Sequence, residues 1–481
     1  MILTRLRRIY FFDSPMIFWL FLFLFFAAGL VLVFVANGTC DNGDSTMHYQ
    51  FARFAPWHPV LFFDHWAKPL YVLLACPASQ FGIPGIKIFN LTLSTGTIFI
   101  TWKVARIFQI KRSALVGVFM AFSPALLIYS LSGLTEPMFA FVLILCIYLY
   151  LSNVIASSVL VISFLPFVRS EGLMICGIFG VLLLLEKRFW LIPLLGVGHI
   201  VYGLVGVIFQ AHNSVLWVFT AIPYAKFGSA YGKGPWGYFI FNLPAFTGWP
   251  LSILLGVGVM VGVVNALKFL RTQQGLREII LVYGCFLTYF LGHTSFWALG
   301  IFNSFGLMRV LIGVLPLMTL IEIRGLNIID VITTGTFKQI IAFGAVASVV
   351  VFPFTKYNGA WKYKAQFCLG SEAVLQEEAV TYVKANHPDW KDYKYYFDNN
   401  YAAIALDMDY FDSTKVFRTY QIWAKPSPKS IVIWDDWYSA FEYRFPLESL
   451  KGNPNVKFVK EFEVKDPEGT VRVVNLFEAV N

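Results

Sequence analysis

Residues 16–36 read MIFWLFLFLFFAAGLVLVFVA, a run of 21 residues without a charged side chain. About 20 apolar residues in a helix span the hydrocarbon core of a bilayer. Arg5, Arg7 and Arg8 precede the run, and a positive flank keeps that end of a helix in the cytoplasm. A cleaved signal peptide is the alternative, but the run is longer than its apolar region and no small-residue site ends it cleanly. The sequence therefore predicts a retained membrane helix.

The composition of the whole chain agrees with this first run. Of 481 residues, 58% are hydrophobic and 14% charged, and the mean hydropathy is +0.66. A soluble domain has about 45–50% apolar and about 25% charged residues. This composition excludes a purely soluble enzyme and a disordered protein. The six cysteines include no Cys-x-x-Cys pair, so a disulfide scaffold is excluded as well.

Charge divides the chain into two parts. Residues 356–481 hold 16 Lys and Arg against 18 Asp and Glu, a net charge of −2. Residues 1–355 hold 21 basic and 10 acidic residues, a net charge of +11. We expect residues 1–355 to form a membrane unit and residues 356–481 a soluble domain. Basic residues orient membrane proteins, so the positive excess does not indicate nucleic acid as a partner.

The apolar runs predict a polytopic α-helical membrane protein of about eleven spans. Ten runs follow the first: 86–105, 113–131, 137–152, 154–168, 172–185, 189–209, 248–267, 278–292, 308–322 and 338–355. The stretch Pro69–Phe81 is short and contains Pro77, and we interpret it as a helix lying in the membrane interface. With this threading, 14 of the 21 basic residues fall at predicted cytoplasmic turns. The loop 37–85 and residues 356–481 are then periplasmic, outside the inner (plasma) membrane.

The loop 37–85 carries dense polar chemistry. It holds Asp41, Asp44, His48, His58 and His65. Ser45 is placed to cap a short helix, in which Asp44 and His48 would share one face. A carboxylate here could act as a general base, a neighbouring lysine could hold a phosphate, and Asp with His could bind a divalent metal. A loop whose charges only face water stays open as the alternative.

Four short stretches follow one another on the predicted outer side. They are Gly43-Asp44, the segment 65–70 (HWAKPL), the segment 130–139 (SLSGLTEPMF) and the segment 169–173 (RSEGL). Together they resemble the GT-C class of polyprenyl-phosphate-sugar glycosyltransferases, which includes protein O-mannosyltransferases and the lipid A aminoarabinose transferase. The likeness covers about residues 10–355. The Asp-Glu pair common in the first loop of that class is absent, since Ser45 follows Asp44, which leaves open whether Asp44 or Asp41 would be the base.

This resemblance implies a GT-C-like fold and a transferase that moves a hexose or pentose from a polyprenyl phosphate to an acceptor hydroxyl, with inversion. The acceptor would be a glycan, a lipid or a protein, and no cofactor other than the possible metal is implied. Asp44, Asp41 and Glu136 would be catalytic, and Lys68, Arg169 and Arg309 would hold the donor phosphate. We assign the substrate-binding role to His48, His58, His65, Glu171 and Tyr231.

Arg309 follows residues 293–297 (HTSFW), which we interpret as an outer loop, and a role as an interfacial anchor stays open for it. Tyr231 lies in an aromatic outer loop, 210–248, which could gate the site or anchor it at the interface. No nucleotide-binding glycine pattern occurs.

Residues 356–481 predict an α/β domain. A helix is expected over Glu372–Asn386, and strands over Tyr393–Phe397, Ser430–Trp434, Val456–Phe462 and Val471–Phe477. Asp435 and Asp436 follow a strand, and we interpret them as turn residues.

A lipid or sugar transporter or flippase is the alternative function. Such a protein usually places charges near the bilayer midplane and carries paired broken helices. Here the charged candidates gather on one side of the membrane, which favours the transferase.

Overall fold

The computed structural model describes residues 11–41, 43–223, 229, 231–355, 366–423, 426–466 and 469–480. Helices make up most of the described residues up to 355. They are α1 Pro15–Val35, α2 Asp44–Phe54, α3 Pro69–Ser79, α4 Gly82–Ile107, α5 Leu115–Ala121, α6 Pro124–Ser130, α7 Glu136–Leu151, α8 Ile155–Ile162, α9 Gly172–Leu185, α10 Val197–Ile208, α11 Trp217–Thr220, α12 Tyr238–Thr247, α13 Trp249–Phe269, α14 Gln273–Glu278, α15 Cys285–Leu299, α16 Leu315–Leu326, α17 Ile329–Ile332 and α18 Gly335–Val351.

Seven helical segments of the described chain are long and apolar enough to cross a membrane. They are Pro15–Val35, Gly82–Ile107, Phe189–Ile208, Trp249–Phe269, Gln273–Leu299, Met308–Ile332 and Gly335–Phe354. Shorter apolar helices occupy Pro69–Ser79, Glu136–Leu151, Ile155–Phe167 and Gly172–Leu185. The protein is thus a multi-pass membrane protein, while the count of eleven spans stays a prediction.

The predicted span 113–131 is not one helix. It divides into α5 and α6 at Ser123-Pro124, where Ser123 has an extended backbone. Proline has no N–H to donate and disfavours the helical conformation of the residue before it. Hydropathy alone does not register this break, because Pro124 lies within an uninterrupted apolar run.

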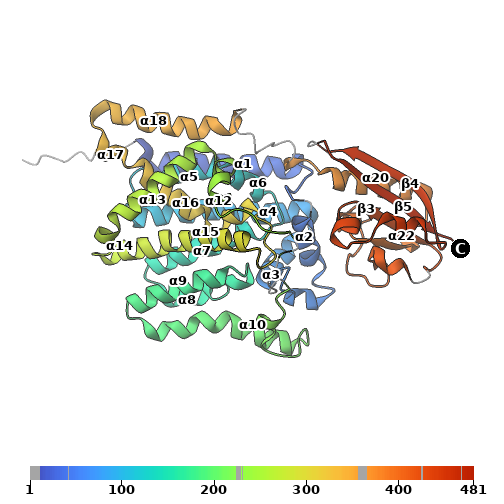
Figure 1. Cartoon of the computed structure of the whole chain (residues 1–481). Coiled ribbons are helices and arrows are strands. Elements are labelled where there is room, and N and C mark those ends of the chain that lie inside the picture. Colours follow the sequence, from blue (N-terminus) through green and yellow to red (C-terminus); the bar gives the residue numbers. More distant parts are fainter. Residues whose placement is uncertain are drawn as a thin grey trace, which may run out of the picture.

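The helices run side by side, with the C-terminal domain at one end of the bundle (Figure 1). α2 and α3 lie at that end, and α14 and α17 lie at the other (Figure 1). Ion pairs join the helices at the α14 end. Arg277 Nε is 2.6 Å from Glu186 Oε1, and Arg324 Nε is 2.8 Å from Glu278 Oε1.

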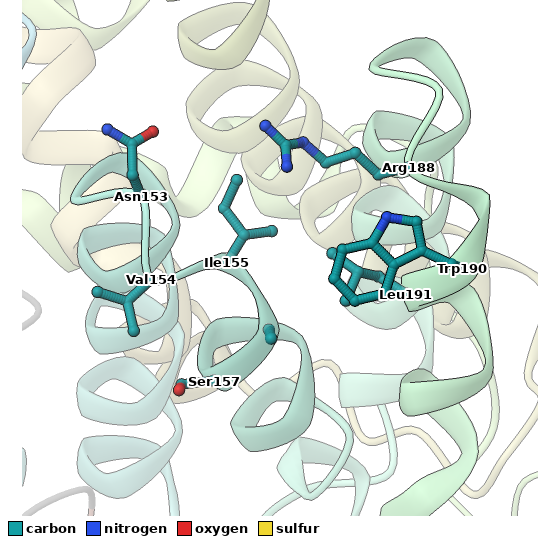
Figure 2. Close-up of a pocket in the computed structure, with 8 residues that line it drawn as sticks. Asn153, Val154, Ile155, Ser157, Arg188, Trp190 and Leu191 are labelled. Atoms are coloured by element: carbon teal, nitrogen blue, oxygen red, sulfur yellow. The ribbon is translucent and has the colours of Figure 1, made fainter.

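A shallow pocket of about 290 Å³ opens at this same α14 end. Figure 2 shows Asn153 of the α7–α8 connection and Ile155 at the start of α8 across from Arg188, Trp190 and Leu191. None of these side chains can act as a general acid or base at neutral pH, since an arginine stays protonated. The pocket is therefore not a candidate for the chemistry predicted above.

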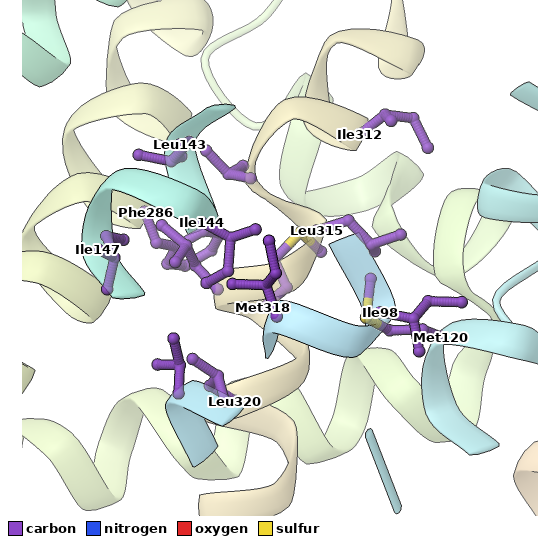
Figure 3. Close-up of a cluster of buried hydrophobic side chains, with 14 of the residues drawn as sticks. Ile98, Met120, Leu143, Ile144, Ile147, Phe286, Ile312, Leu315, Met318 and Leu320 are labelled. Atoms are coloured by element: carbon purple, nitrogen blue, oxygen red, sulfur yellow. The ribbon is translucent and has the colours of Figure 1, made fainter. Parts of the chain in front are cut away.

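The segment Met308–Ile332 forms the centre of the membrane unit. Its apolar window is 83% buried, against 28% for Pro15–Val35. Leu315 and Met318 of α16 pack against Ile98 of α4, Met120 of α5 and Phe286 of α15 (Figure 3). A helix that is apolar on all sides and covered by other helices is an interior helix, so α16 is screened from lipid and α1 is not.

Two glycines let α13 and α16 approach closely. A Cβ at Gly258 would lie 2.1 Å from the backbone oxygen of Ile321, and one at Gly325 would lie 2.2 Å from that of Leu254. Small residues at such crossings allow the backbone contact that holds membrane helices together.

The residues after α18 form a mixed sheet with helices. The strands are β1 Lys394–Phe397, β2 Val416–Phe417, β3 Ser430–Asp435, β4 Val456–Lys465 and β5 Val471–Ala479, and the helices are α20 Ser371–Asn386, α21 Tyr401–Ala405 and α22 Leu447–Lys451. The sheet order is β2-β1-β3-β5-β4. β1 pairs parallel with β2 and β3, whereas β5 pairs antiparallel with β3 and β4. The four predicted strands and the predicted helix are confirmed, and the two-residue strand β2 was missed.

The α13–α16 crossing yields the first test. Gly258→Leu should lower stability by about 1–3 kcal/mol, because the side chain has no space against the backbone of α16. Gly256→Leu, on the same helix, is the control, since a Cβ there meets nothing within 4 Å. Thermal unfolding of both variants in detergent measures the difference, and equal midpoints would contradict the close crossing.

Candidate active site

Three of the predicted acids surround Arg309 at the end of the bundle next to the C-terminal domain. Its Nη1 and Nη2 contact Asp41 Oδ2 and Asp44 Oδ2, and its Nε lies 3.4 Å from Glu136 Oε1. The Arg309 side chain is 9% exposed and that of Glu136 is 1% exposed. A buried guanidinium needs compensating charge, and these carboxylates supply it from the first loop and from the start of α7.

A tight turn fixes the two aspartates of the first loop. Asp41 Oδ1 accepts hydrogen bonds from the backbone N–H of Gly43 at 3.0 Å and of Asp44 at 2.9 Å. Asp44 is then the first residue of α2, where a negative charge suits the helix dipole. The prediction that Ser45 caps this helix is wrong. Gly43 occupies the cap position, and Ser45 Oγ accepts from the Gly133 N–H at 2.6 Å.

Arg169 extends the cluster. Its Nη1 is 2.7 Å from Glu136 Oε1, and its Nη2 is 2.9 Å from Glu171 Oε1. Glu136 therefore lies between Arg309 and Arg169, and it links both predicted phosphate-binding arginines. His293 Nε2 lies 3.4 Å from the same oxygen of Glu171. We name this set the charged cluster: Asp41, Asp44, Glu136, Arg169, Glu171, His293 and Arg309.

Lys68 borders the charged cluster. Its Nζ donates to the His65 carbonyl at 3.1 Å and to Ser170 Oγ at 3.4 Å. The backbone of Lys68 has φ 68°, in the left-handed region that side chains other than glycine rarely adopt. Lys68 immediately precedes α3, and Ser170 lies just before α9, so two helix N-termini meet beside this amine. Helix N-termini favour anions.

The three histidines of the first loop lie in different surroundings and do not form one site. His48 is buried, and its ring stacks on Trp66 at 4.8 Å. Burial lowers the pKa of His48 to about 3, with the charges of Lys68 and Arg169 adding to the effect, so its ring is neutral at physiological pH. His65 Nε2 hydrogen-bonds the Val218 carbonyl at 2.9 Å, away from the charged cluster. His58 Nε2 lies 2.7 Å from Asp409 Oδ2 and joins the loop to the C-terminal domain.

Tyr231 also reaches the C-terminal domain. Its hydroxyl donates to Glu442 Oε1 at 3.2 Å. Burial, followed by the charge of Glu442, raises the pKa of Tyr231 to about 12, so the hydroxyl stays protonated. This contact could not be predicted from the sequence, since Glu442 lies 211 residues further along the chain.

The carboxyl groups of the charged cluster differ in electrostatic state. Burial raises the pKa of Asp44 to about 6, and the Glu136 charge adds to this shift. Burial alone would also raise the pKa of Glu171, but the Arg169 guanidinium beside it holds that pKa well below its usual range. A pKa near neutrality suits a general base, and a permanently charged carboxylate suits the positioning of cations.

Sequence reasoning missed His293, which lies within α15 instead of in an outer loop, so the predicted loop 293–297 is wrong. The sequence could have indicated His293 as a site residue, because a histidine at the end of an apolar run is a polar group at the membrane boundary. The residues that the structure describes contain no group of three or more His, Cys, Asp or Glu side chains placed to hold a metal ion.

The fold agrees with that of known structures. ArnT from Cupriavidus metallidurans bound to undecaprenyl phosphate matches with a TM-score of 0.59 and 11% identity, over 95% of this chain and 98% of that chain. The same protein in the apo state matches with a TM-score of 0.59 and 12% identity, over 96% and 98%. No family model and no curated protein matches the sequence.

The expected architecture is therefore confirmed at the level of the fold. The chain is a multi-pass membrane protein with the GT-C fold of ArnT, followed by a small C-terminal sheet domain.

Proposed function

We propose that this protein is an inner-membrane glycosyltransferase. It moves a sugar from a polyprenyl-phosphate donor to an acceptor hydroxyl on the periplasmic side, with inversion at the anomeric carbon. The observation that carries this proposal is the charged cluster, in which residues from the first loop, α7, the segment just before α9, α15 and the 3-10 helix before α16 converge. The undecaprenyl phosphate bound by ArnT supports a polyprenyl phosphate as the lipid.

The distribution of charge supports the orientation. The end of the bundle away from the C-terminal domain, where α14 and α17 lie (Figure 1), carries several basic residues. They form ion pairs there with Glu186, Glu278 and Asp330, and they are Lys111, Arg112, Arg188, Arg277 and Arg324. Basic residues concentrate on the cytoplasmic side of membrane proteins. The charged cluster, beside the C-terminal domain, is then periplasmic.

Asp44 is the base in this proposal. Its carboxylate takes the proton of the acceptor hydroxyl, whose oxygen forms the new bond to the anomeric carbon. The bond from that carbon to the phosphate oxygen breaks on the opposite face, and its electron pair leaves with the polyprenyl phosphate. Asp41 orients the turn that carries Asp44, while Arg309 holds both carboxylates in place.

The leaving phosphate gains negative charge as the bond breaks, and it needs donors and cations. Lys68 and Ser170, at the N-termini of α3 and α9, are the groups we assign to it. Arg169 directly precedes Ser170 in the chain, and its guanidinium forms an ion pair with Glu171. Arg309, the third predicted phosphate ligand, instead faces three carboxylates, and we assign it the positioning of Asp44.

Asp44→Asn removes the base and keeps the shape of the side chain. Sugar transfer should fall by about 10²–10⁴-fold, the usual contribution of general base catalysis. Mass spectrometry of lipid-linked sugars in a gene-deletion strain carrying the variant measures this loss as accumulated donor. Asp64→Asn, which alters a loop carboxylate bonded to the Ala67 N–H, is the control. A strain with Asp44→Asn that accumulates no donor would exclude Asp44 as the base.

The transfer rate should depend on pH through Asp44. The carboxylate form is required, and its pKa is about 6, so the rate should be flat above that pH and fall about tenfold per unit below it. Initial rates of the purified protein between pH 4.5 and 8 measure this profile. A rate independent of pH down to 4.5 contradicts the assignment.

Lys68→Met removes the charge next to α3 while keeping the length of the chain. Binding of undecaprenyl phosphate should weaken about 10–100-fold, because a charge-assisted hydrogen bond contributes about 1.5–3 kcal/mol. Native mass spectrometry of the purified protein with undecaprenyl phosphate measures the affinity. Lys111→Met, a lysine at the α14 end of the bundle, is the control. Equal affinity in both variants would place the phosphate elsewhere.

A further inference from the structure

The C-terminal domain contacts the turn that carries Asp44. Asn400 Nδ2 donates to the Gly43 carbonyl at 3.0 Å, and Thr46 Oγ1 lies 2.7 Å from Asn400 Oδ1. Asn400 is 6% exposed, so these bonds lie inside an interface that water does not enter freely. The domain is thereby fixed against the first turn of α2.

A second segment of the domain, residues 435–442, reaches the same place from the end of β3. Asp435 was predicted to follow the strand, but it is the last residue of β3; its buried carboxylate accepts from the N–H groups of Trp437 at 3.1 Å and Tyr438 at 2.6 Å, in the turn that follows. The carboxylate thereby caps the helical turn that follows, Tyr438–Glu442.

This turn presses the Tyr438 hydroxyl against Gly43. A Cβ at Gly43 would lie 2.5 Å from Tyr438 Oη, so a side chain there would collide with the hydroxyl. Burial, followed by the charges of Glu372 and Asp44, raises the pKa of Tyr438 and keeps its hydroxyl protonated. A hydroxyl that stays protonated beside Asp44 can donate to an acceptor oxygen and accept from its neighbour.

The same turn carries Glu442, which is exposed and receives the hydrogen bond of Tyr231 described above. Its charge adds to those that raise the pKa of Asp44. The side of Asp44 that faces the C-terminal domain thus holds Tyr438, Glu442 and Tyr231. The side that faces α3 and α9 holds Lys68 and Ser170.

We propose that Tyr438 and Glu442 form the acceptor side of the transferase site, and that the acceptor group they position is a saccharide. The inference rests on the proposed function and deepens it, because it names the class of acceptor. Tyr438 and Glu442 are positioning residues, and the chemical step stays with Asp44.

The side chains around Glu442 give the class of acceptor. Phe441 is 55% exposed, and its ring stacks on that of Trp437 with centroids 5.0 Å apart. A sugar ring offers a flat face of C–H groups and a rim of hydroxyls. The exposed aromatic face takes the C–H groups, and the neighbouring carboxylate accepts the hydroxyl hydrogens.

The test uses the purified full chain, donor lipid extracted from the gene-deletion strain, and cell envelopes of that strain as acceptor. Two rates are measured: sugar transfer to the envelopes and release of free sugar to water. In Tyr438→Phe and in Glu442→Gln, the ratio of hydrolysis to transfer should rise at least tenfold, because water needs no positioning by the domain. Tyr382→Phe on α20 and Glu461→Gln on β4 are matched controls, and their ratio should equal that of the unaltered protein.

An unchanged ratio in both test variants overturns the acceptor-side assignment. Binding of undecaprenyl phosphate by each variant establishes that it is folded, and Glu442→Asp, which keeps the carboxylate, should recover part of the transfer. Absence of both transfer and hydrolysis in the unaltered protein would be a failure of the proposed function instead.

The product identifies the acceptor class. After transfer of a labelled sugar and digestion with proteinase, the label should remain on saccharide fragments. Label on peptides, or on lipid without further sugar, overturns the saccharide assignment.

Discussion

The guanidinium of Arg309 is buried, and this buried charge determines where the neighbouring carboxylates lie. Removing a charge from water costs several kcal/mol unless opposite charges and hydrogen bonds replace the water. Asp41, Asp44 and Glu136 provide those charges, and they come from parts of the chain far apart in sequence. One cation therefore fixes the first loop, the start of α7 and the segment before α16 relative to one another. The carboxylate proposed as base is placed by this arrangement.

Sequence reasoning was most reliable where a single physical property decided the outcome. Apolar length predicted helices such as α1, α4 and α13, and short strand-like runs predicted β4 and β5. It failed where a local conformational effect mattered, as at Ser123-Pro124, or where an apolar run and its polar end belonged to one helix, as at His293. The site was predicted as a set of residues on one side of the membrane, because charge distribution reports the side.

Which of those residues contact one another could not be predicted from the sequence. Arg309 and Lys68 are both cations in predicted outer positions, yet one faces carboxylates and the other faces Ser170 and a backbone carbonyl. Only the three-dimensional arrangement separates them. Tyr438 and Glu442 were not considered at all, since their domain has ordinary composition and no motif. This chain shares the fold of ArnT at only 11% sequence identity. Many apolar sequences satisfy the same packing, so the fold alone does not determine which polar residues pair.

The contact between Tyr438 and Gly43 has a consequence for biogenesis. Residues 435–442 follow the described membrane helices in the chain, so the ribosome makes them after it has made the bundle. Until they emerge and fold, the aspartate turn lacks its cover. If the proposed function holds, the site beside Asp44 is assembled only after residues 435–442 have been synthesised and have folded against the membrane unit, so a shorter nascent chain is not yet an enzyme.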